Sequence, residues 1–251
     1  MDREQKLSKK SQLFLENLNV YLFSSGKDEG QINSIVDELE DHLMEAEAKG
    51  KTVDHIVGQS PKVYMKSLSQ EMTTDFKTIY KYLFMIILGV LSYTVLIDAI
   101  QGPISYSLFE LIGVILISLI MVLAISVVLK YIAANNVSKM KEFGLYYFMS
   151  WLSVALFVAL IYFNDLMNTP ILHFGEMGTV ITVIITLLFL IGFSLWSKTW
   201  LLVIVLALLV IPDFLFKFIE IHTNIQFLLT SIIPFGGIAI YLFFYARSQM
   251  K

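Results

Sequence analysis

The stretch Tyr82–Ile100 constrains the fold of this chain more than any other. It carries no charged side chain between Lys81 and Asp98. Because a helix rises about 1.5 Å per residue, about 20 mostly apolar residues cross the hydrocarbon layer of a bilayer. The stretch therefore predicts a transmembrane helix that separates a polar N-terminal segment from an apolar C-terminal body.

Five more apolar runs follow this stretch. The chain is 57% hydrophobic and 16% charged, which is more apolar and less charged than ordinary soluble domains. A soluble core would break its apolar residues into amphipathic stripes, whereas these runs are uninterrupted. We therefore expect an all-α protein with a small N-terminal cytoplasmic helical domain and a polytopic bundle of six transmembrane helices. The five runs are Leu108–Leu129, Leu145–Phe163, Met177–Trp196, Trp200–Phe218 and Ile225–Tyr245.

The distribution of Lys and Arg predicts the orientation of these spans. Lysines precede the first span, and no Lys or Arg follows it before Lys130, so the positive-inside rule keeps the N-terminal segment in the cytoplasm. We expect a multi-pass protein of the cell membrane with both termini cytoplasmic. The bases near the spans then fall inside, except Lys217: Lys77, Lys81, Lys130, Lys139, Lys141, Lys198, Arg247 and Lys251. The loops near Asn136 and Lys198 face in, and those near Gly102, Asn168 and His222 face out.

We expect residues 1–76 to form the cytoplasmic helical domain and residues 77–251 to form the transmembrane domain. Capping residues and apolar residues at helical spacing divide the first domain into three or four short helices, the second of which covers about Glu29–Lys49. The expected N-caps are Ser8 or Ser11, Thr52, and Ser60 ahead of Pro61, and the expected helix ends are at Gly26, Gly50 and Gly58. The residues expected to face the core are Phe14, Leu15, Leu18, Tyr21, Leu22, Ile32, Ile35, Val36, Leu39, Leu43, Ala46, Val63, Tyr64, Leu68 and Met72.

The second helix also carries a strongly acidic face. Glu38, Asp41, His42 and Glu45 recur there at helical spacing. An acidic, solvated face can steer a basic patch on another protein, so we predict that these residues bind a protein partner. Glu38, His42 and Glu45 have a spacing that could hold a divalent metal. A solvated face explains the same residues without any ligand, and no metal site is predicted.

The run Asp37–Met72 resembles the HAAS-type cytosolic domain. The shared pattern is an acidic helix with a D-H-L-x-E-A core, then G-K-T, a short helix and a G-x-S-P entry to the last helix. The matching residues are Asp41, His42, Leu43, Glu45, Ala46, Gly50, Lys51, Thr52, Gly58, Ser60 and Pro61. Such domains stand at the N-terminus of bacterial multispan membrane proteins, often encoded beside PadR-like transcriptional regulators. The resemblance implies a regulatory or interaction module and assigns no catalytic residue.

The sequence lacks the residues that several classes of function require. The chain has no Cys, which excludes disulfides, thiolate metal sites and a Cys nucleophile. It shows no H-E-x-x-H, G-x-S-x-G or P-loop pattern, and no basic face suggests direct nucleic acid binding. The N-terminal residues lack the apolar core of a cleaved signal peptide. We therefore expect no enzymatic activity and no cofactor.

Acidic residues in or near the predicted spans are a second set of candidates. Charges within a bilayer are costly and often functional, which makes Asp98, Glu110 and Asp213 candidates for a cation, proton or cationic-peptide site. Asp213 stands out because Pro212 precedes it and can free backbone carbonyls. The more ordinary interpretation is that these acids anchor helix ends at the headgroups.

The last run contains Pro234, Gly236 and Gly237. These residues are expected to interrupt the span, and broken helices can line transport sites. A packing kink is the more ordinary explanation, because neighbouring helices can satisfy the freed backbone groups.

These features favour a non-enzymatic regulatory or signalling membrane protein. Its partners would be the lipid bilayer and a cytoplasmic or membrane protein bound by the helical domain. The alternative is a transport subunit such as the permease of an ABC exporter, although the inner loop Lys130–Glu142 is short for a coupling helix. An intramembrane hydrolase is a third class. The sequence indicates neither the ligand nor the oligomeric state.

Overall fold

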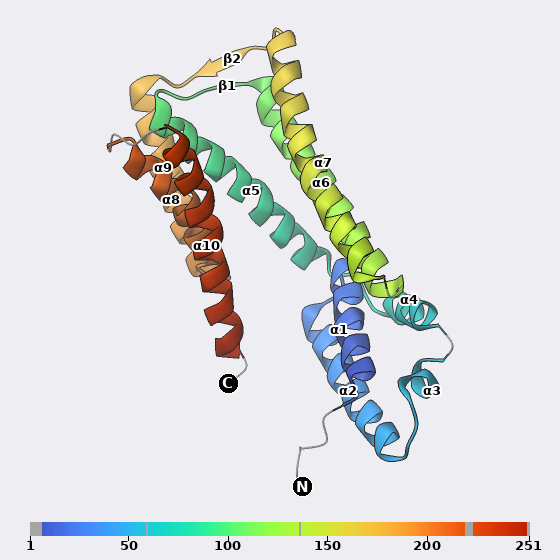
Figure 1. The fold of residues 1–251 in the computed structure, drawn as a ribbon. Coiled ribbons are helices and arrows are strands. Elements are labelled where there is room, and N and C mark those ends of the chain that lie inside the picture. Colours follow the sequence, from blue (N-terminus) through green and yellow to red (C-terminus); the bar gives the residue numbers. More distant parts are fainter. Residues whose placement is uncertain (1–6, 59, 136, 219–222, 250–251) are drawn as a thin grey trace. The chain divides into compact units, whose positions relative to one another are not determined.

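The chain is mostly helical and divides into two compact units. In the computed structural model, the residues that are described are 7–58, 60–135, 137–218 and 223–249 (Figure 1). The all-α class is confirmed, apart from two short strands. The first unit consists of Met1–Phe84 and Leu116–Ala159, and the second of Met85–Ile115 and Leu160–Lys251.

The first unit begins with four helices, where the sequence predicts three or four for the N-terminal domain. They are α1 (Lys9–Ser24), α2 (Glu29–Ala48), α3 (Val53–Val57) and α4 (Pro61–Glu71). The side chains of Ser8 and Ser60 accept backbone N–H groups in the first turns of α1 and α4, as N-caps do. Asp28 caps α2 in the same way and was not predicted. The predicted cap at Thr52 is wrong in one respect, because its side chain makes no capping hydrogen bond to α3.

The core of these helices follows the predicted apolar faces of α1 and α2. Leu18, Leu22 and Leu43 are 0% exposed. Ile35 and Val36 are partly buried and pack against the same cluster. The hydrophobic spacing of these two helices therefore did predict which side chains meet.

The predicted inward face of α4 is wrong at one position. Val63 is 65% exposed, whereas Met65 is 1% exposed and belongs to the core. Met65, Leu68 and Met72 follow one another at spacings of three and four, and so share one side of the helix. Val63 precedes Met65 by two residues and therefore points away from that side.

Four later helices are long and apolar enough to cross a membrane. They are α5 (Phe76–Gln101), α6 (Leu108–Asn135), α7 (Lys139–Leu166) and α8 (Gly175–Ser197). At most 22% of the apolar stretch in any of them is buried, so most of their apolar side chains face outward, as a lipid environment requires. The chain is therefore a membrane protein. Two further helices, α9 (Leu201–Phe216) and α10 (Thr223–Gln249), contain shorter apolar stretches.

The second unit contains a feature that was not predicted. Strands β1 (Ser105–Ser107) and β2 (Ile171–His173) pair antiparallel, with Tyr106 opposite Leu172, and form a small β ribbon (Figure 1). One strand follows α5 and the other precedes α8. The ribbon thus joins two connections that are far apart in the sequence.

The predicted interruption of the last span is wrong, because α10 continues through Pro234. A Cβ atom on Gly237 would lie 2.7 Å from Cδ2 of Leu208. Glycine at this position allows the backbone of α10 to approach α9 closely. Gly237 therefore serves packing in this structure, whereas a Cβ atom on Gly236 would meet nothing within 4 Å.

Some predicted features lie outside the described residues. These are the inner loop at Asn136, the outer loop at His222, the terminal Lys251 and the side chain of Arg247.

The burial of the core face of α1 can be tested by comparing a buried and an exposed leucine of this helix. Replacement of Leu18 by Ala should destabilise the first unit by about 2–5 kcal/mol, because it leaves a cavity in the core. Leu13→Ala is the matched control: Leu13 is 52% exposed, and its replacement should change stability by less than about 0.5 kcal/mol. Hydrogen exchange of the amides of α1 and α2 in the detergent-purified full chain measures both. Equal loss of protection in the two variants would contradict this core.

Candidate functional site

The acidic face of α2, formed by Glu38, Asp41, His42 and Glu45, is exposed throughout. The Oε1 atom of Glu45 lies 2.5 Å from Nζ of Lys49, one turn further along. The hydrogen bond from Lys49, with its charge, lowers the pKa of the Glu45 carboxyl. Because both side chains are exposed, this pair adds little to stability. The structure places all four predicted side chains on one accessible surface, and partner binding there stays a prediction.

The structure offers no metal-binding cluster in the chain segments it describes. Within residues 7–58, 60–135, 137–218 and 223–249, no three His, Asp or Glu side chains lie close enough together to hold a metal ion. His42 and His55 are exposed on separate helices, and His173 is exposed in β2.

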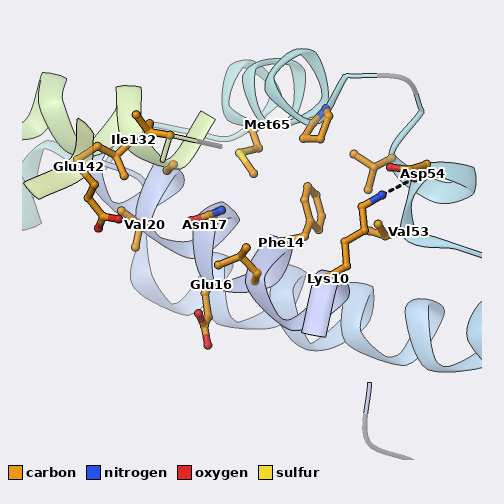
Figure 2. Close-up of a pocket in the computed structure, with 15 residues that line it drawn as sticks. Lys10, Phe14, Glu16, Asn17, Val20, Val53, Asp54, Met65, Ile132 and Glu142 are labelled. Atoms are coloured by element: carbon orange, nitrogen blue, oxygen red, sulfur yellow. Dashed lines mark hydrogen bonds and ion pairs between the residues drawn. The ribbon is translucent and has the colours of Figure 1, made fainter. Parts of the chain in front are cut away.

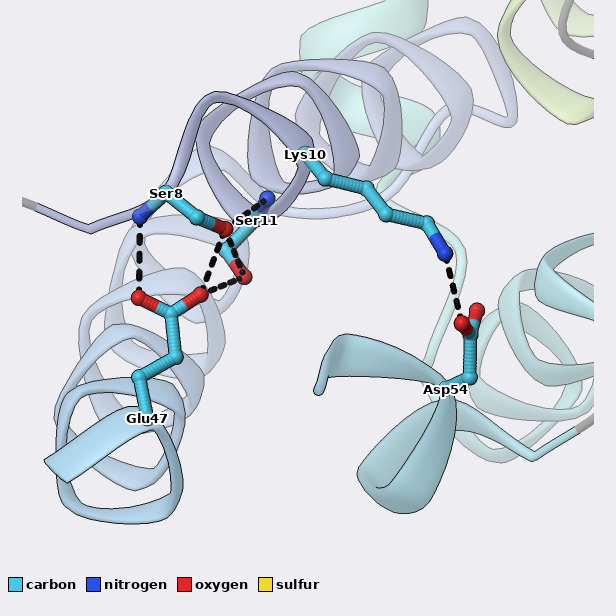
Figure 3. A network of polar contacts seen from close by, with 5 residues as sticks. All are labelled: Ser8, Lys10, Ser11, Glu47 and Asp54. Atoms are coloured by element: carbon cyan, nitrogen blue, oxygen red, sulfur yellow. Dashed lines mark hydrogen bonds and ion pairs between the residues drawn. The ribbon is translucent and has the colours of Figure 1, made fainter. Parts of the chain in front are cut away.

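Another acid of α2, Glu47, has an internal structural role that the sequence analysis missed. Its Oε1 accepts hydrogen bonds from Oγ of Ser8 at 2.5 Å and Oγ of Ser11 at 2.6 Å, and its Oε2 accepts one from the Ser8 backbone N–H at 2.9 Å (Figure 3). The hydrogen bonds from Ser11 and then Ser8 lower the pKa of Glu47. The carboxylate also lies at the N-terminus of α1, where the helix dipole favours negative charge. Nearby, Lys10 pairs with Asp54 across 2.5 Å.

The first unit also contains a groove of about 490 Å³. Residues of α1, α3 and α4 line it together with the facing ends of α6 and α7 (Figure 2). Phe14, Val53 and Met65 give it apolar walls, and Glu16 and Glu142 add negative charge. The groove therefore lies between the helical domain and the ends of α6 and α7 that belong to the same unit.

Polar contacts join the helical domain to α6. The Nζ of Lys62 donates to Oδ1 of Asn135 at 3.2 Å. The Nζ of Lys130 lies 5.9 Å from the centre of the Tyr21 ring, within the range of a cation–π interaction. A displacement of α1 or α4 would therefore change these contacts at the end of α6.

A stronger connection links the α1–α2 turn to the start of α5. Lys27 is buried, and its Nζ donates to the carbonyl of Met72 at 2.9 Å and to Oγ1 of Thr74 at 3.2 Å. The backbone N–H of Asp75 donates to the carbonyl of Gly26 at 2.9 Å. We call these contacts the Lys27 clasp. Because Lys is seldom buried without compensating partners, the clasp is a specific connection between the domain and the first long apolar helix.

Glycine is required at position 26 for two reasons. Its φ is +69°, a conformation that side chains with a Cβ rarely adopt. A Cβ atom there would also lie 2.5 Å from Cδ1 of Ile79 in α5. The glycine that was predicted to end the first helix therefore also allows α5 to approach the turn.

In the second unit, backbone hydrogen bonds are completed around the β ribbon. The N–H of Ile104 donates to Oγ1 of Thr179 at 2.9 Å, and its carbonyl accepts from the N–H of Phe174 at 3.1 Å. The N–H of Leu108, at the start of α6, donates to the carbonyl of Pro170 at 3.1 Å. These contacts satisfy polar groups that would be costly to leave unpaired beside an apolar phase.

Two of the three predicted intramembrane acids lie beside this ribbon. The Oδ2 of Asp98 accepts a hydrogen bond from the phenol of Tyr106 at 3.0 Å. Burial, and then the Asp98 carboxylate, raise the pKa of Tyr106, so the phenol stays protonated and can donate. The N–H of Glu110 donates to Oγ of Ser107 at 2.9 Å, an N-cap arrangement for α6. Asp98 and Glu110 thus lie where the interpretation as helix-end residues expects them.

The third acid, Asp213, lies in α9 beside a polar hollow of about 350 Å³. Lys217 lines the same hollow, and its Nζ donates to the carbonyl of Ile100, close to the C-terminus of α5. A cation is favourable at that end of a helix. This contact gives a local role to Lys217, the base that the predicted topology places alone on the outer side. Sequence spacing could not reveal it, because the two residues are far apart in the chain.

The fold and these polar contacts define a helical integral membrane protein. Residues 84–210, about half of the chain, match the family model described as the HAAS transmembrane region. The chain therefore belongs to the HAAS transmembrane family. No curated protein and no solved structure matches it significantly. The family match covers a different part of the chain from the HAAS-like motif of the N-terminal domain.

The Lys27 clasp can be tested by a substitution that keeps the length of the side chain. Lys27→Met should leave the Met72 carbonyl without its charged partner and destabilise the junction by about 1–3 kcal/mol. Hydrogen exchange in residues 72–79 should accelerate more than in the middle of α2. Lys49→Met is the matched control, because Lys49 pairs only with an exposed acid and its loss should cost less than about 1 kcal/mol. Unchanged exchange at residues 72–79 in Lys27→Met would show that the clasp is not stabilising.

Proposed function

We propose that this protein is a non-enzymatic regulatory or signalling membrane protein whose N-terminal helical domain binds a protein partner in the cytoplasm. In this proposal, residues 1–76 form the cytoplasmic domain and residues 77–251 form six transmembrane spans with both ends of the chain inside. The distribution of Lys and Arg supports this orientation through the positive-inside rule. The family match supports the membrane part.

The observation that carries the proposal is the contrast between the acids of α2. Glu47 is used within the domain, where it accepts three hydrogen bonds from Ser8 and Ser11. Glu38 and Asp41 are exposed and form no ion pair with any described residue. Negative charge that serves no internal contact is available to attract a basic surface on another protein. The acidic face therefore remains the best candidate for partner binding.

The Lys27 clasp supports a route by which partner binding and the membrane part can influence each other. It joins the turn before α2 to the segment that leads directly into α5. A ligand or partner shifts a conformational equilibrium only if it binds the two states with different affinity. A partner on α2 that favours one position of that helix would act on α5 through this junction.

The alternative, a permease subunit, receives less support. Such a subunit would offer an ATPase an amphipathic coupling helix in an inner loop. Helix α6 ends at Asn135 and α7 begins at Lys139, which leaves too few residues between them for a coupling helix. A gene for an ATPase beside this one would favour the permease, and a gene for a winged-helix regulator would favour the regulatory function.

The partner surface can be tested by charge reversal. In the full chain purified in mild detergent, the triple variant Glu38→Lys, Asp41→Lys and Glu45→Lys should lose a specific partner by at least about tenfold, and wild-type capture should weaken as salt rises. The matched control reverses three exposed acids elsewhere in the domain: Glu16→Lys, Glu29→Lys and Glu71→Lys. Quantitative mass spectrometry of the captured proteins measures both. A set of captured proteins that is the same for wild type and both variants would refute the proposed surface.

A further inference from the structure

Two hollows meet at the end of α9 in the second unit. The polar hollow, of about 350 Å³, is lined by Ile97, Ile100 and Gln101 of α5 and by Asp213 and Lys217 of α9. An apolar hollow of about 400 Å³ lies between α5, α8 and α9. Ile100 and Lys217 line both hollows, so the two spaces adjoin at the contact between these residues.

The polar hollow contains two opposite charges that do not pair with each other. Asp213 and Lys217 are separated by one helical turn, the spacing at which an ion pair normally forms. They form none, and Lys217 instead donates to the carbonyl of Ile100. An ammonium has three donors, and in the described chain Ile100 takes one of them. The hollow is therefore lined by a carboxylate and by an ammonium that do not pair with each other, and one of the three donors of the ammonium binds the Ile100 carbonyl.

The apolar hollow has the character of a lipid-facing groove. Its walls include Val183 of α8 and Phe214 of α9, and Leu96 contributes from α5. Phe214 is 48% exposed, as expected of an apolar side chain that faces lipid. An apolar groove that opens to the bilayer is filled by hydrocarbon, since leaving it to water would cost free energy.

We propose that these two hollows together seat one phospholipid with a phosphoethanolamine headgroup. An acyl chain occupies the apolar hollow, the phosphate binds Lys217, and the primary ammonium binds Asp213. The charges support this assignment. An anionic headgroup would gain from Lys217 but would bring no positive charge to Asp213. A choline headgroup has the positive charge but no N–H group to donate to the carboxylate, whereas phosphoethanolamine provides both.

The test is native mass spectrometry of the detergent-purified full chain titrated with dioleoyl lipids carrying ethanolamine, glycerol or choline headgroups. Wild type should bind the ethanolamine lipid at least about tenfold more tightly than the other two, the size expected of one charge-assisted hydrogen bond. Asp213→Asn should remove this preference. Lys217→Gln should weaken the binding of all three lipids, because each carries a phosphate, and Lys217→Arg should restore it.

Asp165→Asn is the matched control, because Asp165 is an exposed carboxylate in α7 that lines neither hollow. It should retain the preference. Glycerophosphoethanolamine, which has the headgroup without acyl chains, should fail to compete at equal concentration. Equal binding of the three lipids by wild type, a preference that survives in Asp213→Asn, or competition by the chain-free headgroup would each overturn the proposal.

Discussion

Backbone groups freed at helix ends must find partners when the helices stand in an apolar phase, and the second unit depends on how this is done. The β ribbon, the Thr179 hydroxyl and the Lys217 ammonium all serve N–H or C=O groups near the ends of α5, α6 and α8. Asp98 and Glu110 lie among these contacts. These polar residues therefore have a structural role. Asp213 differs, because it faces a hollow and has no ion pair with any described residue.

The helical domain uses its charges in two different ways. Glu47 and Lys27 bind groups of the domain itself and of the segment that enters α5, so they determine where α1, α2 and α5 lie within the first unit. The acidic face of α2 takes no part in this. The internal contacts toward the start of α5 and the exposed charge of α2 support the proposal that this domain transmits the binding of a partner.

The sequence predicted what depends on neighbouring residues and missed what depends on distant ones. The cap at Ser8 and the apolar face of α2 follow from local spacing, and both were confirmed. Val63 was misplaced although the spacing of Met65 and Leu68 contained the answer. The β ribbon, the contact of Glu47 with Ser8 and the contact of Lys217 with Ile100 join residues far apart in the chain. No local pattern signals such pairs, because only the packing of helices brings them together.

We propose that the chain crosses the bilayer six times and leaves its helical domain in the cytoplasm. The chain has no Cys, so single cysteines can be introduced and labelled with a membrane-impermeant maleimide in intact and permeabilised cells. The account predicts that Asn168→Cys is labelled in intact cells, and that Lys139→Cys, Lys198→Cys and Lys251→Cys are labelled only after permeabilisation. Labelling of Lys139→Cys or Lys251→Cys in intact cells would contradict it.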